Sequence, residues 1–393
     1  MQDRWNAPSN RTAAPARLLA VALVIALALP AVQARSLFAT ARLYLPVARQ
    51  AHRLYLPPGT PLTSAAGPAE SQRLFGPPAL LAAAGPPSGF VNRVGEELRL
   101  NGQPYTFVGA NVSYLASPFF PEARMEEVIA ALAVRGVQVI RVFTEPWCDL
   151  DRVERLLDLG SQYGLRYILT LQDFYGRTDG YWFKEEFKTE GLPHIREIVP
   201  RFAERPEILM WELMNEPTCP AQDADRACWE ALLNWAQVTS QEIKTLDPNH
   251  LVSAGTQRAG FSARAIETFR RIHALPTIDV VSVHGQAGKL DQGERELERS
   301  IAHELGKPVY FGEVYQRGMD EDCRPLAEAR LVERAAAISR DLTQLTATGV
   351  DGYLLWQYAY GAVELEDGRT QHFCGVYDYA DKDPVWDVLL GME

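Results

Sequence analysis

From Phe90 to the end of the chain, short apolar runs typical of buried strands alternate with segments of helical periodicity. Eight such runs occur, at residues 107–111, 137–143, 166–173, 208–215, 251–255, 279–285, 307–313 and 352–358. Between them, segments such as 124–136 and 228–246 repeat apolar residues at helical spacing. Eight strands that alternate with helices over about 300 residues are the pattern of a (β/α)8 barrel. We therefore predict an α/β fold of the TIM-barrel type.

An open, doubly wound α/β sheet is the alternative arrangement of the same elements. Such a sheet usually carries a glycine-rich phosphate-binding turn after its first strand. The first strand here reads FVGANVSY and contains no G-x-G-x-x-G pattern, so the barrel is favoured. The stretch FVNRVGEELRLNGQPY that precedes it predicts a hairpin with an Asn-Gly turn at Asn101 and Gly102.

The first 34 residues have the composition of a secretory signal peptide. Three arginines, Arg4, Arg11 and Arg17, precede the apolar run LLAVALVIALALP, and the small residues of AVQA follow it. Cleavage is expected after Ala34. An uncleaved membrane anchor is the alternative, but the run is shorter than the roughly 20 residues of a spanning helix. We therefore expect a secreted, extracellular protein.

Residues 35–89 are rich in alanine, proline and glycine and repeat the pentapeptide RLYLP. Such a segment cannot bury enough apolar area to offset its ordering entropy, so we predict a disordered linker. The barrel domain then occupies residues 90–393.

The charge balance excludes some classes of partner. The chain has 39 basic and 50 acidic side chains, a net charge of -11, which repels phosphate backbones and anionic lipid. We expect a monomer with no nucleic-acid partner and no stable membrane association after signal cleavage.

The five cysteines indicate disulfides in an exported chain, with one thiol left over. Cys219 and Cys228 flank a short loop, and Cys323 and Cys374 each lie in a polar segment after an apolar strand. We predict that Cys219 pairs with Cys228 and Cys323 with Cys374, which leaves Cys148 free. Zinc is the competing interpretation, but the chain contains no C-x-x-C or H-E-x-x-H spacing, so no metal or cofactor is expected.

Polar residues end several of the predicted strands, and in a barrel the carboxyl ends of the strands form the mouth where chemistry takes place. These strand-end residues are Arg141, Asp173, Asn215, Glu216, His284, Glu313, Trp356 and Gln357. Two carboxylates at one mouth indicate glycoside hydrolysis, in which one protonates the leaving oxygen and the other attacks or activates water. Glu212 cannot partner Glu216, because four residues along a strand place them about 13 Å apart. Glu313, on another strand, can come close enough.

The same residues resemble the signature set of glycoside hydrolase family 5, a retaining family of clan A with the barrel fold. The resemblance rests on the Asn-Glu-Pro of 215–217 and on four strand-end segments, VIRVF, SVHG, VYFGE and LLWQ, and it covers about residues 90–393. WELMNEP followed by Cys219, and later LDPNHLVSAG, are most similar to the endo-β-1,4-mannanases. The resemblance implies that residues 90–393 form a catalytic domain.

The resemblance also implies a role for each residue. Glu216 would be the acid/base and Glu313 the nucleophile, while Asn215 would donate to the sugar 2-hydroxyl. Arg141 would hold Glu313 ionised, His284 would complete the hydrogen-bond network and Trp356 would form the floor beneath the reacting sugar. A nucleophile needs a low pKa and an acid a raised pKa, and Arg141 beside Glu313 would separate the two in that sense.

The sequence departs from the family at one position. The family usually has His-x-Tyr on the sixth strand, with the Tyr hydroxyl donating to the nucleophile, whereas this chain has His284, Gly285 and Gln286. The Gln286 amide is one replacement donor, and Tyr315, two residues after Glu313, is the other.

Two loop tryptophans, Trp147 and Trp182, follow strands at the same end as the carboxylates and are predicted to stack on sugar faces. The resemblance implies a β-linked polysaccharide as substrate, β-mannan first and β-glucan second. An exo-acting glycosidase and a catalytically silent carbohydrate-binding barrel are the alternatives that it leaves open.

Overall fold

The computed structural model describes residues 89–173, 182–219, 226–260, 262–287, 292–364 and 370–391. The predicted signal peptide and the predicted linker, apart from Gly89, lie outside the described residues, as do segments such as 174–181 and 220–225.

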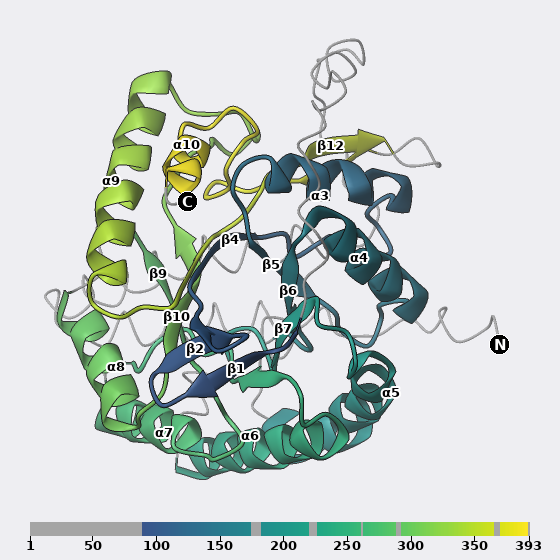
Figure 1. The fold of residues 1–393 in the computed structure, drawn as a ribbon, viewed down its shortest axis with the longest axis vertical. Helices are drawn as coiled ribbons and strands as arrows, with labels where there is room; N and C mark the ends of the chain where they lie inside the picture. The colour runs from purple at the N-terminus through teal and green to yellow at the C-terminus, as the bar shows by residue number, and fades with distance from the viewer. Residues whose placement is uncertain are drawn as a thin grey trace, which may run out of the picture. The chain divides into compact units, whose positions relative to one another are not determined.

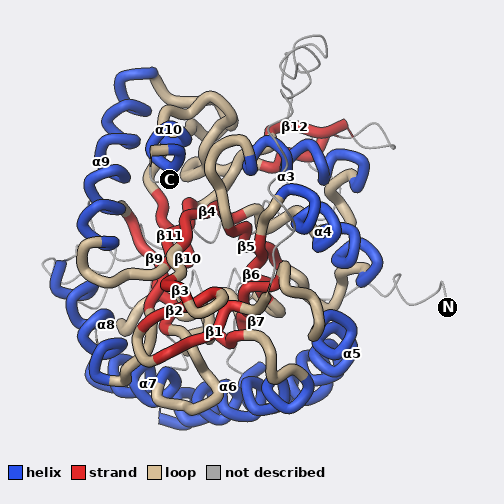
Figure 2. Tube along the Cα trace, viewed as in Figure 1, coloured by secondary structure: helices blue, strands red, loops and turns tan. Residues whose placement is uncertain are grey.

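Eight parallel strands form the central sheet (Figure 2). They are β4 (Phe107–Asn111), β5 (Val139–Phe143), β6 (Arg166–Thr170), β7 (Ile208–Glu212), β8 (Leu251–Ser253), β9 (Val281–Gln286), β10 (Val309–Tyr315) and β11 (Gly352–Leu355). The order is β8-β7-β6-β5-β4-β11-β10-β9, and a parallel bridge between Ser253 and Val280 joins the two ends. The predicted (β/α)8 barrel is confirmed, with each strand at the predicted place.

The helices surround the strands, as Figure 1 shows. They are η2 (Glu122–Arg124), α3 (Met125–Ala133), α4 (Leu150–Tyr163), the π-helix η4 (Trp182–Gly191), α5 (Leu192–Phe202), α6 (Arg226–Leu246), α7 (Ala263–His273), α8 (Gln292–Glu304), α9 (Glu328–Thr346) and α10 (Val385–Leu390). The Asp149 carboxylate, just before α4, caps its first turn by accepting from the Asp151 N–H, and Gly164 follows the helix in the left-handed conformation. Its buried face, including Leu156 and Leu157, packs on the barrel core.

A three-stranded antiparallel sheet closes the amino-terminal end of the barrel. It consists of β1 (Val91–Val94), β2 (Glu97–Leu100) and β3 (Gln103–Pro104). The predicted Asn-Gly turn joins β2 to β3, whereas the turn between β1 and β2 is an addition to the predicted hairpin. Val91 and Leu98 are 1% exposed and pack against residues at the start of the barrel strands, such as Phe107 and Val139.

The part of the chain after the barrel and the cysteines complete the described fold. After β11 the chain forms the antiparallel pair β12 (Gly361–Glu364) and β13 (Thr370–Phe373) before α10. Both predicted disulfides are present, Cys219–Cys228 and Cys323–Cys374, and Cys148 is a free thiol. Within the described residues, no helix has the length and apolar character needed to span a membrane.

Candidate active site

Glu216 and Glu313 lie together at the mouth of the barrel. Glu216 follows β7 and Glu313 lies within β10, and a carboxylate oxygen of one is within 4.8 Å of a carboxylate oxygen of the other. Both side chains are largely buried, with 7% and 6% exposure. The predicted pairing of carboxylates from the fourth and seventh barrel strands is therefore what the structure contains.

The backbone of Glu216 is held in an unusual conformation. Its φ is +50°, in the left-handed region that costs a non-glycine residue about 1–3 kcal/mol. The Glu216 N–H donates to the Gly255 carbonyl at 2.9 Å. Gly255 has a φ of +75°, and a Cβ there would lie 1.8 Å from the Met214 carbonyl oxygen. A glycine at 255 thus allows the two strand ends to approach and lock Glu216 in place.

Arg141, on β5, connects the carboxylates to the barrel interior. Its guanidinium donates to Glu313 Oε1 at 2.8 Å and to Glu212 Oε1 at 2.7 Å. It also donates to the side-chain oxygens of Asn111 and Asn215, each at 2.9 Å. The Arg141 side chain is completely buried, so every one of these bonds is shielded from water. Arg141 contacts Glu313 as predicted and also neutralises Glu212.

Glu212 lies deeper in the barrel, as its position on β7 predicted. Its oxygens accept from Thr170 Oγ1 at 2.9 Å and from the Tyr310 hydroxyl, and the side chain has no exposed area. Because these donors and Arg141 satisfy both oxygens, Glu212 supports the site from below and does not reach the mouth.

The electrostatics of Glu313 differ from the sequence prediction. Burial raises the pKa of Glu313 to about 7, and the nearby charge of Glu216 adds to this shift, while His284 and Arg141 oppose it. The predicted lowering of the nucleophile pKa by Arg141 is thus outweighed by desolvation. The sequence identified the cation but not how deeply the carboxylate is buried.

His284, on β9, lies between the two carboxylates. Its Nδ1 is 2.9 Å from Glu216 Oε1 and 3.6 Å from Glu313 Oε1. The other ring nitrogen, Nε2, is buried without a hydrogen-bond partner among the described residues, which favours the tautomer that carries its hydrogen on Nδ1. A Cβ at position 312 would lie 2.9 Å from Nε2, so Gly312 makes room for the ring.

Neither replacement donor proposed for the family tyrosine is bonded to Glu313. Gln286 pairs with Tyr315 across β9 and β10, but over the described part of the chain neither side chain makes a hydrogen bond with Glu313. Burial first, and then the charges of Glu216 and Glu313, raise the pKa of Tyr315 to about 12. The direct donor to Glu313 is Arg141.

The three predicted tryptophans lie in different surroundings. Trp356, directly after β11, and Trp147, after β5, are each half-buried. The peptide between Trp356 and Gln357 is cis. Trp182 is only 1% exposed and packs in the core against Gly191. The prediction that Trp182 stacks on a sugar is therefore wrong, because its ring offers no accessible face.

Sequence reasoning missed two residues of this cluster. Asn111, at the end of β4, accepts from Arg141 and donates to the carbonyls of Gly312 and Leu355 at 2.8 and 3.1 Å. Gln257, in the loop after β8, donates from Nε2 to Glu216 Oε1 at 2.9 Å. Asn111 is a polar strand-end residue and could have been found by the rule that found Arg141. Gln257 has no such signal.

Among the described residues, the side chains at the barrel mouth fit a metal ion poorly. Glu216, His284 and Glu313 could each direct one atom at a single cation, but Arg141 and the His284 N–H already satisfy those oxygens. Cys323, His372 and Cys374 form a second group of this kind, in which the disulfide occupies both sulfurs. The described residues thus favour chemistry by the two carboxylates themselves.

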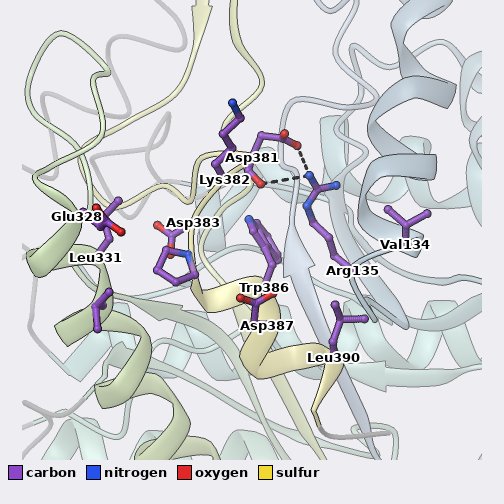
Figure 3. Close-up of a pocket in the computed structure, with 12 residues that line it drawn as sticks. Val134, Arg135, Glu328, Leu331, Asp381, Lys382, Asp383, Trp386, Asp387 and Leu390 are labelled. Atoms are coloured by element: carbon purple, nitrogen blue, oxygen red, sulfur yellow. Dashed lines mark hydrogen bonds and ion pairs between the residues drawn. The ribbon is translucent and has the colours of Figure 1, made fainter. Parts of the chain in front are cut away.

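A separate hollow of about 550 Å³ lies away from this cluster (Figure 3). Residues of α9, α10 and the segment after α3 line it, and Arg135 and Asp381 form an ion pair on its wall. Asp383 is likewise paired, with Arg334. None of the predicted site residues lines this hollow, so the barrel mouth remains the candidate active site.

A (β/α)8 barrel with two carboxylates close together at the carboxyl ends of its strands has the arrangement that glycoside hydrolysis requires. The family model described as "GH family 5 beta-mannosidase-like" matches residues 161–289. The resemblance to glycoside hydrolase family 5 predicted from the sequence is therefore confirmed.

The individual relatives agree with this family. Mannan endo-1,4-beta-mannosidase F of Aspergillus clavatus is 27% identical over 253 residues, which cover 60% of this chain and 50% of that protein. The chain thus spans half the length of this relative. Among solved structures, the endo-1,4-beta-mannanase of Rhizomucor miehei has a TM-score of 0.58 at 19% identity, covering 77% of this chain and 97% of that one. The endoglucanase Cel5A of Thermobifida fusca has a TM-score of 0.51 at 18% identity, covering 69% and 85%. At these identities the structural likeness shows the fold.

Proposed function

We propose that this protein is a retaining glycoside hydrolase that acts as an endo-β-1,4-mannanase, with Glu216 as acid/base and Glu313 as nucleophile. The observation that carries the proposal is the separation of the two carboxylates, whose nearest oxygens lie within 4.8 Å. Retaining enzymes hold their carboxyl groups about 5–5.5 Å apart, whereas inverting enzymes need about 6.5–9.5 Å to admit a water. The names of the relatives support β-mannan as the substrate.

In the first step, Glu313 attacks the anomeric carbon while Glu216 gives its proton to the glycosidic oxygen. The C–O bond to the leaving sugar breaks and a covalent glycosyl ester with Glu313 forms. Arg141 is bonded to Glu313 and, among the described residues, not to Glu216, so it favours the negative charge on the nucleophile.

In the second step, a water replaces the leaving sugar and Glu216 removes its proton as the water attacks the ester. Glu313 leaves as a carboxylate, and two inversions restore the β-configuration. Asn215 has one amide hydrogen directed at Asp173 at 3.1 Å. In this proposal its second amide hydrogen donates to the sugar 2-hydroxyl, and the half-buried Trp356 forms the floor beneath the reacting sugar.

The substrate is tested by a reducing-sugar assay on galactomannan, glucomannan, carboxymethyl cellulose, lichenan and xylan, with sizing of the products. We expect oligosaccharides of several lengths from both mannans. Release of monosaccharide alone would indicate exo action, and a preference for carboxymethyl cellulose or lichenan would indicate a glucanase. Binding without hydrolysis of any polymer would indicate a silent carbohydrate-binding barrel.

The mechanism is tested by proton NMR of the first product to appear. A retaining reaction gives the β-anomer before mutarotation. Initial appearance of the α-anomer would overturn the assignment of Glu313 as nucleophile.

We further propose that the chain is exported with cleavage after Ala34. The two disulfides support this proposal, because disulfides persist mainly in oxidising compartments. Mass spectrometry of protein recovered from the medium should find Arg35 at the amino terminus, and sedimentation should find a monomer.

A further inference from the structure

Gln257 approaches the proposed acid/base Glu216 from the segment that follows β8. Its Nε2 is 2.9 Å from Glu216 Oε1. The amide nitrogen must face the carboxylate, because the amide oxygen in that place would meet another acceptor.

The loop holds Gln257 firmly. Thr256, the preceding residue, bonds twice to Ser282 of β9, through its N–H at 2.8 Å and its hydroxyl at 2.6 Å. The backbone carbonyl of Gln257 accepts from the backbone N–H of His284 at 2.6 Å. Two residues later, Ala259 N donates to Glu298 Oε1 of α8 at 2.7 Å. The amide is therefore presented to Glu216 from a backbone that is fixed on both sides.

Gln257 and His284 donate to the same oxygen of Glu216. Gln257 Nε2 and His284 Nδ1 each lie 2.9 Å from Oε1. Two donors on one carboxylate oxygen place the negative charge there and oppose its protonation. The proton of the neutral acid is consequently carried by Oε2.

We propose that Gln257 is a positioning residue that fixes which oxygen of Glu216 carries the proton. The inference rests on the proposed function and deepens it. In the first step the Oε2 proton passes to the glycosidic oxygen as the C–O bond breaks, and in the second a proton from the attacking water returns to Oε2. Without Gln257 the carboxyl group can rotate and carry its proton on either oxygen, so fewer molecules are ready to react.

The first test compares Gln257→Met with wild type on two substrates. Met keeps the side-chain length and removes the donor. For a mannan oligosaccharide, whose leaving group needs protonation, we expect kcat/KM to fall about tenfold, as for the loss of one hydrogen bond to a charged group. For dinitrophenyl β-mannobioside, whose leaving group needs no acid, kcat/KM should change less than about twofold. Gln241→Met, the same change at an exposed position of α6, should alter neither. Equal losses on both substrates would show that Gln257 only supports the loop.

The second test does not depend on turnover. It follows the carbon-13 NMR signal of the Glu216 carboxyl carbon as a function of pH, and the signal is assigned by its absence in Glu216→Gln. In Gln257→Met the midpoint of this titration should lie about 0.5 to 1 pH unit higher than in wild type, because the ionised form loses a donor. Among the described residues, the titratable groups His284, Glu313 and Tyr315 face Glu216, and the substitution leaves all three in place. An unchanged titration would overturn the inference. If wild type cleaves no β-mannoside, the proposed function fails while this titration still tests the hydrogen bond.

Discussion

Glu216 and Glu313 are chemically identical side chains that the barrel places in different surroundings. Glu313 is bonded to a guanidinium, while Glu216 accepts from an amide and an imidazole. The difference predicts distinct effects of removal. Glu216→Ala should keep most of kcat/KM for an activated aryl glycoside but lose kcat, since the ester intermediate lacks a base. Glu313→Ala should lose both by about 10³ or more. Steady-state kinetics decide this, and near-normal turnover by Glu313→Ala, free of contaminating wild type, would refute the roles.

Because Glu313 is buried, we expect its ionisation to lower the free energy of unfolding at neutral pH. Its pKa is raised from 4.5 in the unfolded chain to about 7 in the folded protein. The folded state therefore binds the proton more tightly, and this contribution to stability is present below about pH 4 and is lost as the pH rises through 7. Glu313→Gln should raise Tm at pH 8 by about 3 °C or more, with a much smaller gain near pH 4.

Differential scanning fluorimetry across that pH range measures the effect. Glu296→Gln, the same change at an exposed position of α8, serves as the control and should follow wild type at every pH. A gain for Glu313→Gln that did not depend on pH would argue against the titration of Glu313 as its cause.

At the scale of single elements, the two disulfides predict a separation of stability from activity. Cys219 and Cys228 are 9 residues apart, and Cys323 and Cys374 are 51 residues apart. The loop-entropy model assigns about 2–3 kcal/mol to the first bridge and about 4 kcal/mol to the second. The first bridge, however, begins three residues after Glu216 and holds the exit of β7.

Replacing each cysteine pair by serines should therefore rank the two variants differently for the loss of stability and for the loss of activity. The Cys323/Cys374 variant should lose more free energy of unfolding in urea, while the Cys219/Cys228 variant should lose more kcat/KM at 25 °C. If the Cys219/Cys228 variant kept full activity, the bridge would have no part in placing Glu216.

The elements also show how far the sequence alone could reach. Strands are readable from apolar runs, and the residues that end them, such as Glu216, His284 and Glu313, follow from the barrel rule. Trp182 was misplaced because its burial depends on the packing of η4 against α5 and α6, which no local pattern encodes. Gln257 was missed because a loop residue has no strand register to reveal its direction. The raised pKa of Glu313 was missed because burial is a property of the complete fold.

In the molecule as a whole, residues that stabilise the fold lie at one end of the barrel and the candidate active site lies at the other. The sheet β1-β2-β3 covers the amino-terminal end, whereas the carboxylates lie at the other. Leu98→Ala, which removes a side chain with 1% exposure from that cover, should cost about 2–5 kcal/mol of unfolding free energy. The kcat/KM at 25 °C should stay unchanged. Leu390→Ala, at a position with 42% exposure, is the control and should have little effect in chemical denaturation. A loss of activity in folded Leu98→Ala would contradict the separation.

The bonds of Asn111 have a consequence for how the active site comes into being. Asn111 donates to Gly312 and Leu355, which are 201 and 244 residues further along the chain. At a synthesis rate of about 5–20 residues per second, Leu355 is added roughly 12 to 50 s after Asn111. A nascent chain therefore holds Asn111 and Arg141 without their final neighbours for more than half of its synthesis. The recovery of activity during refolding should accordingly be among the slowest signals, because it reports the pairing of the first barrel strand with the last.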